Sequence, residues 1–294
     1  MEKLPLPRGR VLALEPFAVM GVLNTTPDSF HAASRRTTLA AAREAALAML
    51  ASGAAIIDIG GESTRPGSAP VDEAEELERV IPAIEALRRE SDAAISVDTR
   101  KAAVWKAALD AGADILNDVS ALRDSPEAGA LAAKAGAPVV LMHMKGEPAT
   151  MQEAPYYDDC PSEVRSFLLD AAARALAAGV PAERIVLDPG IGFGKRLEDN
   201  LALLSALDSL RDLGYPLLVG LSRKGFVGSL TGKPVEGRLA GSLGAAAAAW
   251  TLGARIFRVH DVAETRDLLL VLSSILGMKT RSPRAGASGA GRGG

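Results

Sequence analysis

Residues 54–99 decide the fold, and they read AAIIDIGGESTRPGSAPVDEAEELERVIPAIEALRRESDAAISVDT. The apolar runs at 54–61 and 93–99 have the length of buried strands, and the segment before the second run is rich in the Ala, Leu, Glu and Arg of a helix. Continuous apolar strands that alternate with helices are typical of a parallel sheet covered by helices.

The same alternation runs through the chain. Strand-like runs occupy residues 17–24, 54–61, 93–99, 113–120, 137–144, 184–190, 216–223 and 254–262. Eight units in about 260 residues predict a single-domain α/β protein, a (β/α)8 TIM barrel spanning 17–277. Residues 1–16 would form a lead segment, and the Gly/Ser/Arg-rich residues 278–294 are expected to be disordered. A doubly wound open sheet is the alternative arrangement.

The composition excludes several classes of function. The chain has 294 residues, 48% of them hydrophobic, and a net charge of −3 with acidic and basic residues interspersed, which argues against a nucleic-acid or membrane-surface role. No apolar run reaches the length of about 18 residues that a spanning helix needs. The single cysteine, Cys160, cannot form an internal disulfide, so a reducing cytoplasm is the expected compartment.

Polar residues follow the strand-like runs at their C-terminal ends. In a barrel these ends face one shared mouth. Any single polar residue there can be explained by the surface position of a strand end, but the whole set favours a common pocket. Its members are Asn24, Asp98, Asn117, Asp118, His143, Asp188, Ser222, Arg223, Lys224, Arg258, His260 and Asp261.

The last two strands carry most of the positive charge of this set. Barrels frequently bind phosphate in the loops after strands seven and eight. Those loops supply Ser222, Arg223, Lys224, Arg258 and His260, which predicts an anionic, phosphorylated ligand. The alternative is a group of surface cations paired with acids such as Asp261.

Asp98 and Asp188 each end an apolar run, so both should be substantially buried. A buried carboxylate needs a metal, a proton to transfer, or paired N–H donors. Together with Asn117 and Lys224, these carboxylates suit a flat heterocycle that carries amino, ring N–H and carbonyl groups.

Three loops are longer than the usual connection of about 2–6 residues. They cover residues 25–37, 61–70 and 190–199. In the second loop Arg65 precedes Pro66 and is therefore extended, and Pro66-Gly67 fits a type II turn. This loop is predicted to be a lid that presents Thr64 and Arg65.

The ordered set of motifs resembles the dihydropteroate synthases of the folate pathway over about residues 17–276. The motifs are MGVLNTTPDSF (20–30), GGESTRPGS (60–68), SVDT (96–99), NDVS (117–120), LMHMKG (141–146), LDPGIGFGK (187–195), GLSRKGFVG (220–228) and RVHDV (258–262).

The resemblance implies a barrel transferase, usually a homodimer, that joins 6-hydroxymethyl-7,8-dihydropterin diphosphate to 4-aminobenzoate with Mg²⁺ as cofactor. It implies sulfonamides as competitive inhibitors.

The resemblance also implies the roles of single residues. The catalytic set would be Asn24, Arg65, Asp98, Lys224, Arg258 and His260. By the same resemblance the pterin-binding residues are Asp98, Asn117, Asp188, Phe193, Lys224 and Arg258. The diphosphate would contact Asn24, Arg258 and His260, with Asn24 also on the metal. The aminobenzoate site would comprise Thr64, Arg65, Pro66, Ser222, Lys224 and Gly225.

Two departures from the family pattern stand out. The family commonly has SFSDGG in the first lid, where this chain has SFHAAS at 29–34, and it often has Ser where this chain has Gly225. Two other functions stay open from the sequence: a pterin-binding barrel methyltransferase and a pterin-binding protein without catalysis. The STRPG lid and the Arg/His diphosphate site favour the synthase over the methyltransferase.

Overall fold

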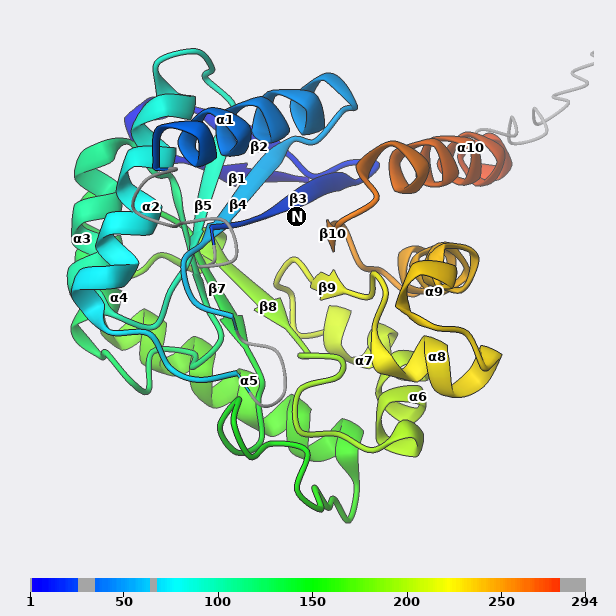
Figure 1. Cartoon of the computed structure of the whole chain (residues 1–294). Coiled ribbons are helices and arrows are strands. Elements are labelled where there is room, and N and C mark those ends of the chain that lie inside the picture. The colour runs from blue at the N-terminus through cyan, green and yellow to red at the C-terminus, as the bar shows by residue number, and fades with distance from the viewer. Residues whose placement is uncertain (1, 26–34, 64–67, 281–294) are drawn as a thin grey trace, which may run out of the picture.

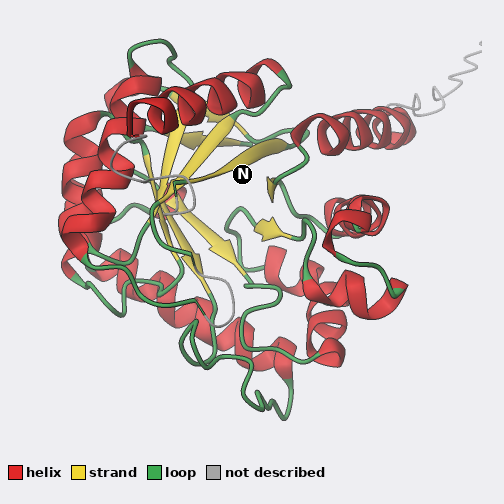
Figure 2. Ribbon diagram, in the orientation of Figure 1, coloured by secondary structure: helices red, strands yellow, loops and turns green. Residues whose placement is uncertain are grey.

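The predicted barrel is confirmed in the computed structural model of the chain, which describes residues 2–25, 35–63 and 68–280. Eight parallel strands are hydrogen-bonded in the order β8-β7-β6-β5-β4-β3-β10-β9, and helices lie outside them (Figures 1 and 2). The strands are β3 (Ala18–Asn24), β4 (Ile56–Gly60), β5 (Ala94–Asp98), β6 (Ile115–Asp118), β7 (Val139–Met142), β8 (Ile185–Asp188), β9 (Leu218–Gly220) and β10 (Ile256–Val259).

The helices alternate with these strands. They are α1 (Arg35–Ala51), α2 (Glu73–Arg88), α3 (Ala102–Ala111), α4 (Glu127–Ala135), α5 (Cys160–Ala177), α6 (Leu197–Ser205), α7 (Leu207–Arg211), α8 (Gly225–Thr231), α9 (Leu239–Thr251) and α10 (Val262–Thr280). Within the described part of the chain, no helix combines the length and the apolar character needed to cross a membrane.

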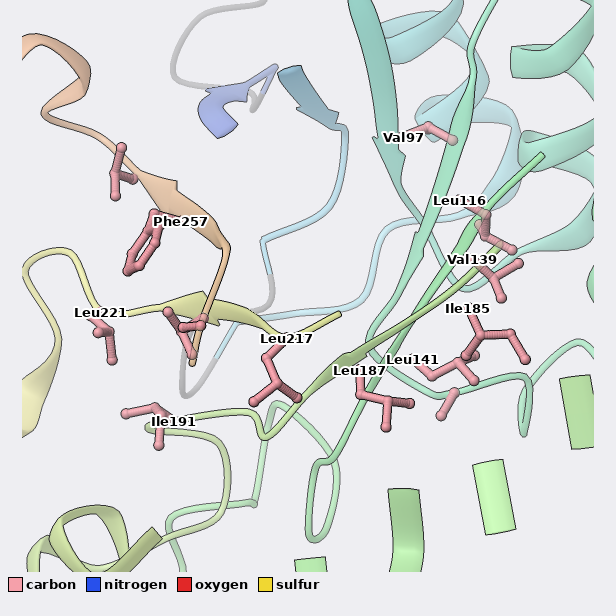
Figure 3. Close-up of a cluster of buried hydrophobic side chains, with 14 of the residues drawn as sticks. Val97, Leu116, Val139, Leu141, Ile185, Leu187, Ile191, Leu217, Leu221 and Phe257 are labelled. Carbon is pink, nitrogen blue, oxygen red and sulfur yellow. The ribbon is translucent and has the colours of Figure 1, made fainter. Parts of the chain in front are cut away.

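The ring of strands closes between β8 and β9. A bridge pairs Leu187 with Leu217, and the Leu187 N–H donates to the Pro216 carbonyl at 3.0 Å. These two leucines belong to the large apolar layer between strands and helices, part of which is drawn in Figure 3. Each fully buried aliphatic side chain in that layer contributes about 1.5–3 kcal/mol.

An antiparallel hairpin covers the N-terminal end of the barrel. Its strands, β1 (Lys3–Pro5) and β2 (Val11–Ala13), pair Leu4 with Leu12. Leu4, Leu6, Leu12 and Leu14 pack against the first residues of the barrel strands, among them Ile56, Ile115 and Val186. The described side chains therefore fill this end of the barrel, which leaves the opposite end for a ligand.

Asp114, just before β6, binds three arginines beneath this hairpin. Its carboxylate is fully buried and pairs with Arg8 and Arg10 from the N-terminal segment and with Arg88 Nη2 at 2.6 Å. It also accepts the Ile95 N–H at 3.0 Å. The carboxylate therefore has four donors and links the N-terminal segment to α2 and β5.

Candidate active site

A pocket opens at the C-terminal ends of the strands, as the barrel geometry predicts. Eight residues singled out from the sequence line it: Asp98, Asn117, Asp188, Phe193, Ser222, Lys224, Arg258 and His260. Asn24 is exposed at the end of β3, in register with Gly60, and is not part of this lining. Gly225 begins α8 directly after Lys224. Thr64, Arg65 and Pro66, and the SFHAAS segment, lie outside the described residues.

Strand register brings the first two polar groups together. Asp98 pairs with Gly60 on one side and with Asn117 on the other. The backbone of Gly60 and the Asp98 side chain are close, since a Cβ at Gly60 would be in van der Waals contact with the Cβ of Asp98, at 3.4 Å. Asp98 is 6% exposed, and burial raises the pKa of its carboxyl to about 7, although Arg258 opposes that rise. Additional N–H donors from a ligand would therefore stabilise the ionised form of this carboxyl.

Asp188 lies in the pocket at the end of β8. Its Oδ1 accepts the Gly190 N–H at 2.7 Å, and burial raises the pKa of its carboxyl to about 6. The neighbouring buried acid Asp118 differs, because it accepts the N–H groups of Ser120 and Leu122, both at 2.7 Å, and closes a turn. Asp118 was expected to face the mouth, but its carboxylate is hydrogen-bonded to backbone N–H groups and does not line the pocket.

The glycine-rich loop after β8 forms one wall of the pocket. Gly190 has φ +65, and a Cβ there would lie 1.9 Å from the His143 carbonyl oxygen, so no other residue fits. Phe193 of this loop packs under Lys224, whose Nζ is 4.0 Å from the ring centroid. Apolar Val119 and Met142 complete this side of the pocket.

His143 was also expected at the mouth, but it lies behind this loop. It is buried, and its Nδ1 shares a hydrogen bond with Lys195 Nζ at 2.9 Å. Burial lowers the pKa of His143 to about 2 and that of Lys195 to about 7. Lys195 also donates to the carbonyls of Gly190 and Phe193, so the pair fixes the loop from beneath.

The loop after β9 carries two cations: Arg223 is bound by Asp261, and Lys224 lines the pocket. Arg223 has φ +58 and forms a bidentate ion pair with Asp261, with Nε–Oδ2 at 3.0 Å and Nη2–Oδ1 at 2.5 Å. For Arg223 the alternative account, a cation paired with Asp261, is therefore correct. Its N–H donates to Ser242 Oγ at 2.8 Å, which helps to hold the left-handed backbone that precedes Lys224. Ser222 Oγ accepts from the His260 N–H at 3.3 Å at the edge of the pocket.

Sequence reasoning missed Asp58, which lies in the middle of β4 and is fully buried. It pairs with Arg258 Nε at 2.6 Å and accepts from Asn117 Nδ2 at 3.2 Å. Arg258 Nη2 reaches Asp98 Oδ2 at 2.7 Å. The available signal was a single acid inside the apolar run AAIIDIGG, the same signal that identified Asp98 and Asp188.

A metal held by the protein alone finds no support in residues 2–25, 35–63 and 68–280. No three His, Cys, Asp or Glu side chains in these ranges are arranged to hold an ion. The pocket therefore offers hydrogen-bond acceptors, two cations and apolar walls, which suits an aromatic heterocycle with an attached anion.

The model of the family described as pterin binding enzyme matches residues 20–260, which contain this pocket, β3 from Met20 onward and the other seven barrel strands. The chain belongs to the pterin-binding enzyme family. The pocket lined by Asp98, Asn117 and Asp188 therefore lies within the part of the chain that matches the family.

Members of this family with known activity are similar over almost the whole chain. The dihydropteroate synthase of Escherichia coli (strain K12) is 46% identical over 272 residues, which cover 92% of this chain and 96% of the relative. The solved structure of Xanthomonas albilineans dihydropteroate synthase with 4-aminobenzoic acid has a TM-score of 0.86 at 46% identity, covering 95% of this chain and all of that one. A Yersinia pestis dihydropteroate synthase in a sulfonamide drug complex has a TM-score of 0.86 at 46% identity, covering 92% and 98%.

Proposed function

We infer that this chain catalyses the dihydropteroate synthase reaction: it joins 6-hydroxymethyl-7,8-dihydropterin diphosphate to 4-aminobenzoate and releases diphosphate. The observation that carries this inference is a single pocket that combines the buried acceptors Asp98, Asn117 and Asp188 with the cations Lys224 and Arg258. The near full-length similarity to synthases supports the same reaction.

The pterin ring is the group that we assign to the buried end of the pocket. Its amino and ring N–H groups would donate to Asp98, Asn117 and Asp188, and charged hydrogen bonds of this kind contribute about 1.5–3 kcal/mol each. Lys224, seated on Phe193, would donate to an acceptor atom of the ring. The apolar walls favour a flat ring over a hydrated polar ligand.

Arg258, His260 and Asn24 are proposed to bind the diphosphate. Arg258 and His260 are on β10 and in the segment directly after it, and Asn24 ends the adjacent strand β3. The demanding step is loss of diphosphate from a CH₂ carbon. Fixed positive charge beside the departing oxygens stabilises that transition state, while the electron-rich pterin stabilises the carbon that becomes cationic.

Mg²⁺ fits this site as an ion carried largely by the substrate. The exposed Asn24 amide offers an oxygen ligand, and Mg²⁺ commonly takes its other ligands from substrate phosphates and water. When bound, the ion would neutralise charge on the departing diphosphate. An ion carried by the substrate is consistent with the described residues, in which no three His, Cys, Asp or Glu side chains are arranged to hold a metal.

The aminobenzoate is proposed to lie between the loop at residues 64–66 and the segment Ser222–Gly225, with Thr64, Arg65 and Pro66 on one side and Ser222, Lys224 and Gly225 on the other. The arylamine is neutral at pH 7, so its nitrogen can attack without a strong general base. The contribution of the protein is then orientation of two substrates in one pocket. Sulfonamides, as analogues of 4-aminobenzoate, are expected to compete for this site.

The decisive experiment is a turnover assay with both substrates and Mg²⁺. We expect formation of 7,8-dihydropteroate and release of diphosphate that depends on 4-aminobenzoate. Asp98→Asn is the matched variant, because it keeps the size of the side chain and removes its charge. Tight pterin binding without product from the wild-type chain would refute the synthase and favour a binding protein without catalysis.

A cytoplasmic homodimer is proposed as the working form. Helix α10 exposes Leu270, Val271 and Ile275, which are 44%, 59% and 57% exposed, so it offers an apolar surface to a second copy. Sedimentation at micromolar concentration would test the dimer.

A further inference from the structure

Asp58 is closely connected to the pocket and yet does not line it. Its side chain is 0% exposed, and it lies below Asn117 and Arg258, to both of which it is hydrogen-bonded. The pocket lining includes both of those partners but not Asp58. Because it is not exposed, Asp58 would act on a ligand through these hydrogen bonds and through its charge, which raises the pKa of the Asp98 carboxyl.

The first consequence concerns Asn117. A carboxylate paired with arginine has only acceptor atoms, so the amide nitrogen of Asn117 must face Asp58. The structure has this orientation, with Nδ2 at 3.2 and 3.4 Å from the two Asp58 oxygens. The amide oxygen is then the end turned away from Asp58, and Asn117 offers the pocket an acceptor.

The second consequence concerns Arg258, which is held by two carboxylates at two different atoms. Nε, close to the base of the guanidinium, bonds Asp58 at 2.6 Å, and Nη2, at its tip, bonds Asp98 at 2.7 Å. A heterocycle that donates to Asp98 competes with Nη2 for the same oxygens. It does not compete with Nε, because Asp58 is inaccessible to it.

We propose that Asp58 is a positioning residue that retains Arg258 at the pocket when the pterin displaces the guanidinium tip from Asp98, so that the released tip is available to the diphosphate. This inference rests on the proposed function. Without the Asp58 charge, Asp98 would be the carboxylate that still holds Arg258 among the described residues, which would draw the guanidinium onto the pterin-binding acid and away from the diphosphate.

The proposal is tested by a ratio of affinities. Calorimetry gives the affinities for 6-hydroxymethyl-7,8-dihydropterin with and without its diphosphate, both with Mg²⁺, and their ratio is the diphosphate preference. Asp58→Asn is expected to weaken both ligands, and to lower the preference by about tenfold, since a charged hydrogen bond to the diphosphate is lost. In an Arg258→Gln background, Asp58→Asn should change the diphosphate preference by less than about twofold, because Asp58 can no longer act through the Arg258 guanidinium.

Asp114→Asn is the matched control. Asp114 is equally buried and also binds arginines, but it lies at the opposite end of the barrel. It should alter the free energy of unfolding and leave the preference unchanged. If Asp58→Asn shows no cooperative unfolding, Asp58→Ser, which leaves space for water, is measured in its place.

The outcomes separate this inference from the proposed function. A wild-type chain that turns over both substrates, together with an Asp58 variant that keeps the preference, overturns the positioning role alone. An equal loss of preference in the wild-type and Arg258→Gln backgrounds does the same, because Asp58 would not act through Arg258. A wild-type chain that neither binds nor converts the pterin diphosphate overturns the proposed function and this inference with it.

Discussion

The two ends of the barrel use buried carboxylates in opposite ways. At the N-terminal end, Asp114 has three arginines and a backbone N–H as donors, and a hairpin covers it. At the C-terminal end, Asp58 and Asp98 share one arginine, Arg258. The first arrangement satisfies a charge within the fold, while the second leaves acceptor capacity at Asp98 that a ligand can use.

The two carboxyls that line the mouth also have raised pKa values. Burial raises the pKa values of Asp98 and Asp188 to about 7 and about 6, because their own hydrogen bonds do not offset the loss of water. Raised carboxyl pKa values in a cleft are typical of functional sites. The comparison therefore predicts that changes at the N-terminal end affect folding and that changes at the mouth affect binding.

The largest expected effect is on stability. Asp114→Ala removes the common partner of Arg8, Arg10 and Arg88 and should lower the free energy of unfolding by about 3 kcal/mol. Denaturant titration measures this loss. The affinity of the folded variant for the pterin diphosphate should stay within about twofold, and a large loss of affinity would show that the two ends of the barrel are coupled.

The converse expectation applies to Asp98→Ala. Removal of the charged acceptor should weaken the pterin diphosphate by about tenfold to a few hundredfold, because charged hydrogen bonds contribute about 1.5–3 kcal/mol each. Stability should fall less than for Asp114→Ala, since Asp98 is buried with fewer donors. Unchanged affinity in calorimetry would remove Asp98 from the pterin site.

The sequence predicted where this mouth lies because the polar residues at strand ends, taken as a set, indicate a common pocket. Asp98, Asn117, Asp188, Lys224 and Arg258 each follow or end an apolar run, and a parallel barrel collects such positions at one face. The same rule failed for His143. A strand end can also turn toward the helix layer, and there His143 packs against Phe167 at 4.8 Å between ring centroids.

The interior and the hairpin could not be predicted in the same way. Asp58 and Arg258 are 200 residues apart, so their pairing depends on a completed barrel. The N-terminal segment had no periodic pattern long enough to indicate a two-stranded hairpin, and its leucines are buried only because the open barrel end accepts them. Asp114 likewise has its arginine partners only in the folded chain.

A pH titration sharpens the contrast at the mouth. If the pterin N–H groups donate to Asp98 as proposed, they bind its ionised form. The pKa of Asp98 is raised to about 7, so affinity should be constant above about pH 8 and fall as the pH drops through 7. The fall should approach tenfold per pH unit, with a further contribution near pH 6 from Asp188.

The ligand for that titration is 6-hydroxymethyl-7,8-dihydropterin without diphosphate, which avoids titration of the phosphate. The stability of the free protein should change in the opposite sense, because the contribution of a carboxyl with a raised pKa is complete below its unfolded value and is lost as the pH rises through about 7. Asp98→Asn is the control and should abolish the step near pH 7. A pH-independent affinity in the wild-type chain would mean that Asp98 is already ionised throughout.

The smallest expected effect concerns Gly225, the first residue of α8. A Cβ at this position meets no atom within 4 Å, so Gly225→Ser can be accommodated without strain. If the aminobenzoate carboxylate lies beside Lys224 as proposed, the new hydroxyl gains one hydrogen bond of about 0.5–1.5 kcal/mol, and the KM for 4-aminobenzoate should fall about two- to tenfold.

Gly244→Ser in α9 is the matched control for Gly225→Ser. A Cβ at Gly244 also meets no atom within 4 Å, and this helix residue is remote from the lining of the pocket. Both substitutions should change stability by less than about 1 kcal/mol, since serine is a better helix residue than glycine. An unchanged KM in Gly225→Ser would place the aminobenzoate carboxylate away from the start of α8, whereas a lower KM in both variants would indicate a general effect on helix order.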